Sequence, residues 1–327
     1  MKKPDPVEQA LDRLAALKNE AGGPGVAAEL KAFLKNRFNL VVAKAAKITG
    51  QVRATELVPD LVGAFHRLME NPSKLDKGCA ATTEIVSALY EMDYTEPEVY
   101  LLGIHHIQME GSFGPPVDAA AKLRAISALA LARTRHPAAL DEIVSLLVDK
   151  WPEARIGAVR AMAVNGGSAG ALVLKLKILT GENEPEVLAE CFSGLLAAAP
   201  ERSLALVAGF IDSEGRQSEN LAVAEAALLA LGSSRLPAAL DLLKAKLERT
   251  AGGPLRKAVL LAIAMIRSDA AIEFLLALLG ECSPSVAKDV MAALAFFRGN
   301  ETVRSRVESV VARRNEKSVS EIFRQEF

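Results

Sequence analysis

The sequence contains few aromatic residues. Phe, Tyr and Trp make up 5% of the 327 residues, and Trp151 is the single tryptophan. Ala and Leu dominate the apolar half of the chain instead. Ala and Leu favour helices, and small Ala lets helices approach closely, whereas β-sheets are enriched in β-branched and aromatic residues. This composition argues against a β-sandwich and predicts an all-α fold.

Cysteine is also scarce. Cys79, Cys191 and Cys282 are odd in number, far apart and embedded in apolar helical patterns. This usage argues against a disulfide framework and a zinc site, and it favours a reducing compartment. The first residues, Met-Lys-Lys-Pro-Asp-Pro, do not lead into the apolar segment that a signal peptide requires. We therefore expect a cytoplasmic protein.

The chain lacks long apolar runs and a charge of one sign. The apolar run Leu221–Leu231 contains Glu225 and is shorter than the roughly 20 residues of a membrane helix. Thirty-nine basic residues against 40 acidic ones give a net charge of −1, whereas a protein that coats nucleic acid carries a basic excess. We expect neither membrane association nor a nucleic-acid partner.

One short motif occurs twice. Residues 135–141 read Arg-His-Pro-Ala-Ala-Leu-Asp, and residues 235–241 read Arg-Leu-Pro-Ala-Ala-Leu-Asp. The separation corresponds to about three repeats of roughly 33 residues, a period typical of helical repeat proteins. Proline suits the first turn of a helix, and the aspartate that follows favours the helix dipole. The motif therefore marks the start of the second helix in a repeated helix–turn–helix unit.

The whole chain divides by this register. We expect a capping helix pair at 1–38, a capping tail at 315–327, and about eight helix pairs at 39–72, 77–110, 120–150, 151–183, 184–217, 218–250, 253–282 and 283–314. Each helix carries one apolar stripe that only a stacked neighbour can bury. The predicted architecture is a right-handed α-solenoid of antiparallel helix pairs in one continuous domain. A Gly- and Pro-rich insertion at 109–119 interrupts it, and both a binding loop and a plain insertion fit that segment.

The repeats resemble HEAT repeats, especially the short kind found in phycobilisome lyases. The matching features are the Pro-Ala-Ala-Leu start of second helices and an arginine that follows the first apolar position of first helices, as at Arg124, Arg155 and Arg256. The resemblance implies that these arginines pair with carboxylates of neighbouring units. It covers roughly residues 39–314 and implies a fold, because one fold serves many functions.

No catalytic, cofactor or metal motif emerges from the sequence. His106 and Glu110 have the spacing of two ligands on one helix face, but no third ligand lies nearby. The glycines at 166, 167 and 170 join two helices and lack the Lys-Ser/Thr of a phosphate-binding loop. We predict that the chain is not an enzyme and binds no cofactor.

The leading functional prediction is a non-catalytic scaffold or adaptor, a monomer that binds another protein or peptide. Second helices commonly line the inner face of a solenoid, which makes their polar residues the candidate partner-binding positions: His66, Arg67, His105, Asp141, Ser145, Lys175, Lys177, Asp241 and Lys244. Residues 181–220 are acidic and 1–50 basic, which suits a partner of complementary charge. The alternative is a HEAT-like enzyme or enzyme subunit, similar to phycobilin lyases or to DNA-binding alkylpurine glycosylases.

Overall fold

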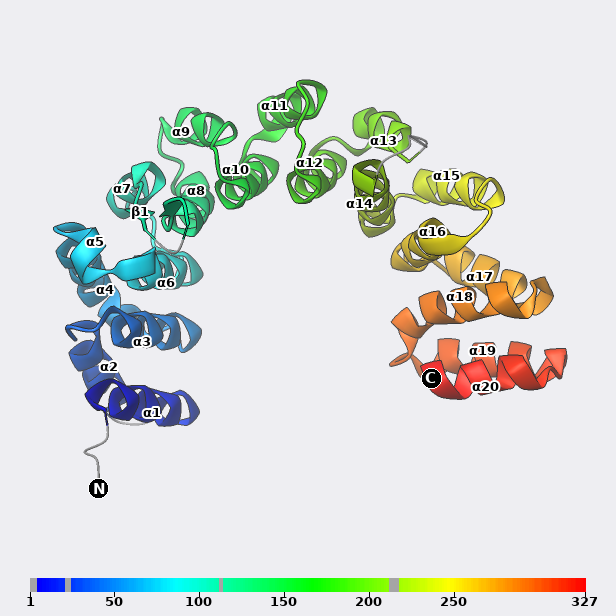
Figure 1. Cartoon of the computed structure of the whole chain (residues 1–327), viewed down its shortest axis with the longest axis horizontal. Helices are drawn as coiled ribbons and strands as arrows, with labels where there is room; N and C mark the ends of the chain where they lie inside the picture. Colours follow the sequence, from blue (N-terminus) through cyan, green and yellow to red (C-terminus); the bar gives the residue numbers. More distant parts are fainter. Residues whose placement is uncertain (1–4, 21–24, 112–113, 212–217) are drawn as a thin grey trace. The chain divides into compact units, whose positions relative to one another are not determined.

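The computed structural model describes residues 5–20, 25–111, 114–211 and 218–327. The chain forms two compact units, Met1–Val173 and Leu174–Phe327, and each is considered by itself. Helices dominate both units (Figure 1), which confirms the prediction of an all-α fold. None of the helices in the described ranges combines the length and hydropathy that a membrane span requires.

The first unit contains ten helices, two short 3₁₀ turns and two short strands within its described residues. In chain order they are α1 Pro6–Asn19, α2 Val26–Leu34, α3 Asn39–Gln51, η1 Thr55–Leu57, α4 Val58–Met69, α5 Pro72–Leu75, η2 Lys77–Cys79, α6 Ala80–Glu91, α7 Glu98–His105, β1 Met109–Glu110, β2 Val117–Asp118, α8 Ala121–Thr134, α9 Ala139–Leu146 and α10 Pro152–Asn165. Helix α11, Gly167–Leu179, contains the division between the units.

Within its described residues, the second unit contains helices and no strands. Its elements are α12 Pro185–Ala198, α13 Pro200–Gly209, α14 Ser218–Ser234, α15 Pro237–Glu248, α16 Gly253–Met265, α17 Asp269–Glu281, α18 Pro284–Leu294, η3 Ala295–Phe297, α19 Glu301–Arg314 and α20 Lys317–Glu326. Proline occupies the first turn of several of these helices, where its missing N–H costs no intrahelical bond.

The repeated arginines end the first helices of their pairs. Arg135 follows α8, Arg235 follows α14 and Arg267 lies just after α16, with φ angles of 58°, 54° and 58°. The left-handed region is uncommon for residues other than glycine, and it turns the chain sharply at a helix end. The arginine of the motif therefore has a structural position: it closes the first helix so that the second can begin.

Successive first helices form the core of each unit. Helices α3, α6, α8 and α10 pack in series in the first unit, and α12, α14, α16 and α18 do so in the second. Glycine allows the closest approaches. A Cβ added to Gly157 would lie 2.6 Å from the Cβ of Ala125, and one added to Gly232 would lie 2.8 Å from the Cα of Ala262. Neither position has room for a side chain, so these contacts fix the spacing between repeats.

The HEAT-type arginines bind groups at the joints between repeats. Arg256 donates to Oδ2 of Asp289, 2.8 Å from Nε, and that aspartate lies on the next first helix, α18. Arg124 pairs with Asp149 in the turn after α9, at 2.9 Å. Arg155 donates to the main-chain carbonyl of Asp149, at 2.9 Å. The implied pairing with a carboxylate of the neighbouring unit is thus present for Arg256, whereas Asp149, the partner of Arg124, lies in the same unit, 120–150.

The insertion at 109–119 contains a small β-hairpin, with residues 112–113 outside the described ranges. Met109 pairs with Asp118, and Glu110 pairs with Val117, in antiparallel register. Gln108 ties the hairpin to the turn between α5 and η2, because its side-chain amide nitrogen donates to the carbonyl of Asp76 at 3.0 Å and to Oε1 of Glu110 at 2.5 Å. The hairpin is therefore held by hydrogen bonds to residues distant in sequence.

A buried ion pair anchors the second strand. Oδ2 of Asp118 lies 2.7 Å from Nη1 of Arg124, and the two side chains are 2% and 4% exposed. Burial raises the pKa of the Asp118 carboxyl, but the amides of Ala120 and Gln108 and the Arg124 guanidinium outweigh burial and hold that pKa below its ordinary value. Asp118 consequently stabilises the fold in its ionised form.

Gly232→Ala is expected to lower the free energy of unfolding by about 1–3 kcal/mol, because the added methyl group overpacks the contact between α14 and α16. Gly209→Ala is the matched control, since a Cβ at the end of α13 meets nothing within 4 Å. Urea unfolding of both variants measures the difference. Equal effects at the two positions would contradict the proposed close contact.

Asp118→Asn is expected to lower the free energy of unfolding at neutral pH by about 3 kcal/mol, near the lower end for a broken buried pair, because Asp149 still neutralises Arg124. A lowered folded-state pKa means that the carboxylate stabilises above its unfolded pKa, near 3.9, and that this stabilisation is lost as the pH falls through the folded value. The stability difference between native and variant protein should therefore shrink below about pH 4. Urea unfolding at several pH values tests this, and a difference independent of pH would refute it.

Candidate functional site

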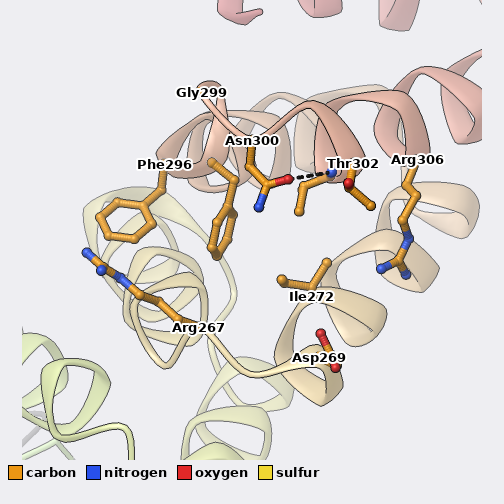
Figure 2. Close-up of a pocket in the computed structure, with 10 residues that line it drawn as sticks. Arg267, Asp269, Ile272, Phe296, Gly299, Asn300, Thr302 and Arg306 are labelled. Atoms are coloured by element: carbon orange, nitrogen blue, oxygen red, sulfur yellow. Dashed lines mark hydrogen bonds between the residues drawn. The ribbon is translucent and has the colours of Figure 1, made fainter.

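The second helices α17 and α19 lie side by side and enclose a groove. Its largest cavity, of about 640 Å³, is at the N-terminal ends of the two helices (Figure 2). Two narrower cavities of about 380 and 360 Å³ follow toward the C-terminal ends and share four lining residues, Leu276, Ala277, Val310 and Arg313. The three cavities together form one site along the two helices.

The floor of the groove is apolar and its rims carry opposite charges. Ile272, Leu276 and Val310 line the floor and are 6–7% exposed. The rim from α17 carries carboxylates, and the rim from α19 carries guanidinium groups: Asp269, Glu273 and Glu281 against Arg306, Arg313 and Arg314. On α17 these positions recur at steps of four and eight residues, and on α19 Arg313 and Arg314 follow Arg306 by seven and eight residues, which places each set along one side of its helix.

One ion pair crosses the groove. Arg306 of α19 pairs with Glu273 of α17. Arg306 lines both the largest cavity and the next one, so this pair marks the boundary between them. Both side chains are at least one-third exposed, and a pair so exposed contributes about 0–1 kcal/mol to stability. A ligand can therefore replace the pair at little cost in stability.

The other two arginines of the positive rim, Arg313 and Arg314, differ in exposure and in the number of hydrogen bonds they make. Arg314 is 7% exposed, pairs with Glu316 at 2.8 Å and donates to the carbonyl of Leu279 at 2.5 Å, so it holds α19 in place. Arg313 is exposed, and within the described ranges its Nε donates only to the carbonyl of Ser309 in its own helix, at 3.3 Å. Arg313 and Arg306 are therefore the rim cations available to a ligand.

The largest cavity has an arginine resting on an aromatic ring. The guanidinium carbon of Arg267 lies 4.8 Å from the centre of the Phe296 ring, a cation–π arrangement that leaves the planar N–H fork open. Asn300 accepts a hydrogen bond from the amide of Val303 through Oδ1 at 3.2 Å, which leaves its NH₂ group as a donor. Figure 2 shows these groups around one hollow.

The cysteine thiols do not offer a nucleophile. Burial raises the pKa of Cys79 to about 12, with further contributions from the carboxylates of Asp76, Glu110 and Asp118. Burial likewise raises the pKa of Cys191 to about 12, and it raises that of Cys282. All three thiols are therefore protonated at neutral pH, and the thiolate is the reactive form.

No group of three metal-ligating side chains is found among the described residues. The pair considered from the sequence is divided between other contacts: His106 Nε2 lies 3.1 Å from Oε1 of Gln108, whereas Glu110 accepts from the amide of Gly78 at 2.8 Å. Both residues help to hold the hairpin.

The residues predicted to bind a partner in the first unit lie on α4, α7 and α9. His105 pairs with Glu142 at 3.0 Å and so links α7 to α9. The hydroxyl of Ser145 donates to the carbonyl of Asp141, one turn earlier, at 3.1 Å. On α4, Arg67 donates to the carbonyl of Leu34 at 3.0 Å, and His66 lies 4.0 Å from Glu98.

The remaining predicted residues lie on α11 and α15. Lys177 is mostly buried and pairs with Glu182 at 2.6 Å, whereas Lys175 is exposed. Lys244 rests over the ring of Phe274 at 5.0 Å, and Asp241 is exposed on the same helix. None of the predicted residues lines the groove. Within the acidic segment 181–220, Asp212 and Glu214 fall outside the described residues.

The groove residues were missed because they come from two repeats. Arg306, Arg313 and Arg314 are visible in the sequence as a basic cluster. Their seven-residue spacing at 306 and 313 is the one signal that could have placed them on a single helix face. Arg267 and Phe296 lie in different repeats, so their contact depends on stacking.

The chain was compared with protein-family models, with curated proteins and with solved structures. No family model matches the chain, and no curated protein matches it. One solved structure to which the chain is similar is that of human deoxyhypusine hydroxylase in complex with glycerol, with 20% identity, a TM-score of 0.30, and coverage of 80% of this chain and 91% of that one.

The finding bears on two predictions. The chain has a HEAT-like, all-helical repeat fold, as the helix pairs show. The prediction of a non-catalytic scaffold that is not an enzyme is contradicted, because the protein found to be similar is an enzyme by name. That prediction relied on the absence of catalytic motifs from the sequence, and residues contributed by several repeats form no local motif.

Proposed function

We propose that this chain is a HEAT-like enzyme or enzyme subunit that holds a segment of a protein substrate in the groove between α17 and α19. The observation that supports the proposal is an apolar floor between two charged rims. An amphipathic segment buries its apolar side chains on such a floor. The three cavities follow both helices for most of their length, which suits an extended or helical segment better than a compact ligand.

The charges of the two rims indicate which charges the bound segment carries. The α17 rim is negative and the α19 rim is positive. A segment with basic residues along one edge and acidic residues along the other satisfies both rims and can bind in one orientation only, because complementary charges set register and direction. A nucleic-acid backbone is uniformly negative and meets the carboxylates of α17, so nucleic acid is outside the proposal.

A phycobilin-lyase-like activity is a second candidate. It is favoured by the size and charge of the largest cavity, about 640 Å³ with Arg267 and Arg306 in its lining and the rings of Phe296 and Phe297 beside them. Two guanidinium groups could pair with the two propionates of a linear tetrapyrrole. This candidate extends the resemblance to phycobilisome-lyase repeats from the fold to the activity.

The proposal also covers the handedness of the helix pairs, the cellular compartment and the oligomeric state. The helix pairs of each unit wind as a right-handed superhelix, as stacked pairs of this kind do. The protein acts in the cytoplasm, and it does so as a monomer.

Ala277→Trp is expected to weaken substrate binding at least about tenfold, equal to about 1.4 kcal/mol, because Ala277 is exposed and lines both narrow cavities. The probe is a labelled peptide with leucines at helical spacing, glutamates along one edge and lysines along the other, measured by fluorescence anisotropy. Ala270→Trp is the control, since Ala270 is also exposed on α17 but lies outside the cavity lining. Equal binding by the two variants would reject the groove as the site.

A photoreactive residue at position 277 tests the enzyme part of the same proposal in cells. The segment identified by this capture is then examined by mass spectrometry in cells with native protein and in cells with Ala277→Trp, and it should carry a covalent modification in the first case only. A captured segment of identical mass in both would contradict an enzymatic role.

For the second candidate, phycocyanobilin is expected to show a shifted absorption band with the native protein and a weaker shift with Arg306→Ala. Arg304→Ala is the control, as Arg304 is exposed on α19 outside the cavities. An unchanged spectrum with the native protein would remove this candidate.

A further inference from the structure

The largest cavity is the one at the end of the groove, beside the connection from α18 to α19. The connection from α18 to α19 forms one wall, through Phe296, Phe297 and Gly299. At the other side, the Arg306–Glu273 pair separates the cavity from the two narrow ones. A chain that continues in both directions does not suit a compartment bounded in this way, whereas the end of a chain does.

The cavity also has unpaired charges of both signs. In the part of the chain that the structure describes, Arg267 has no carboxylate partner, and its guanidinium is held only against the Phe296 ring. Asp269 likewise has no basic partner there. Figure 2 shows Arg267 on the Phe296 side of the cavity and Asp269 on the other side, beyond Ile272. One ligand that presents an anion and an N–H donor a short distance apart would satisfy both residues.

Arg267 is well placed to receive a carboxylate. Its backbone is fixed in the left-handed turn between α16 and α17, with φ 58°, and Phe296 holds the plane of its guanidinium. A guanidinium can bind a carboxylate through two parallel N–H···O bonds, a geometry that lysine cannot reproduce. The NH₂ group of Asn300 and the hydroxyl of Thr302 line the same cavity and add donors.

From these observations we infer that the largest cavity binds the free C-terminal carboxylate of the substrate segment. The carboxylate pairs with Arg267, Asp269 accepts the main-chain N–H of the last residue, and the last side chain lies on Ile272 and Val303. The preceding residues occupy the narrow cavities. This inference rests on the proposed function and specifies it: the groove recognises the end of a protein chain.

The test uses the full chain and two forms of the labelled peptide, one ending in a free carboxylate and one in an amide. The free acid should bind the native protein about tenfold more tightly than the amide. That preference should vanish with Arg267→Ala and be reduced with Arg267→Lys, which keeps the charge but loses the planar fork. Arg304→Ala should keep the full preference.

The outcomes separate this inference from the proposal beneath it. If the acid and the amide bind native protein equally while Ala277→Trp weakens both, the groove is the site and the carboxylate inference is overturned. A preference for the acid that survives Arg267→Ala overturns it as well. If neither peptide binds, the groove proposal fails and takes the inference with it.

Discussion

Close contact between successive first helices is the constraint on which the rest of the structure depends. At Gly157 and Gly232 the backbones of neighbouring helices approach so closely that a methyl group has no room. These contacts set the distance between repeats, and the second helices follow because short turns join them to the first. In the second unit, α16 and α18 pack directly, and their spacing determines where α17 and α19 stand. The groove runs between α17 and α19. Buried apolar residues form its floor, and charged residues of the two helices form its rims.

The two units use polar residues in contrasting ways. In the first unit, Asp76, Gln108 and Asp118 are at most 5% exposed: Gln108 and Asp118 hold the hairpin, and the carboxylate of Asp76 accepts hydrogen bonds from the amides of Ala81 and Thr82 in α6. Each of these buried side chains makes hydrogen bonds within the fold, which makes the cluster structural. In the second unit, Arg267 and Arg313 are exposed beside a cavity and have no carboxylate partner among the described residues. Unsatisfied charge beside buried apolar surface is what a binding site requires.

Much of the fold could be predicted from the sequence, and little of the site. Apolar periodicity and proline positions indicate the helices, because both are local properties: Pro152 and Pro237 begin α10 and α15. The hairpin could not be foreseen, since its two-residue strands depend on Gln108 and Asp118 bonding to distant residues. The left-handed φ of Arg135 and Arg235 was equally hidden, because glycine is the residue that signals this conformation and arginine seldom adopts it. Arg267 and Phe296 meet only after two repeats stack, so no spacing along the chain reveals them.

The central claim is that the chain acts through the groove between α17 and α19. Hydrogen–deuterium exchange with and without the amphipathic peptide tests this most directly, because exchange reports protection along the whole chain without any substitution. The account predicts slower exchange in α17, in α19 and in the connection at 295–300, with the other second helices unchanged. Protection on α9 or α11, with none on α17 and α19, would contradict it.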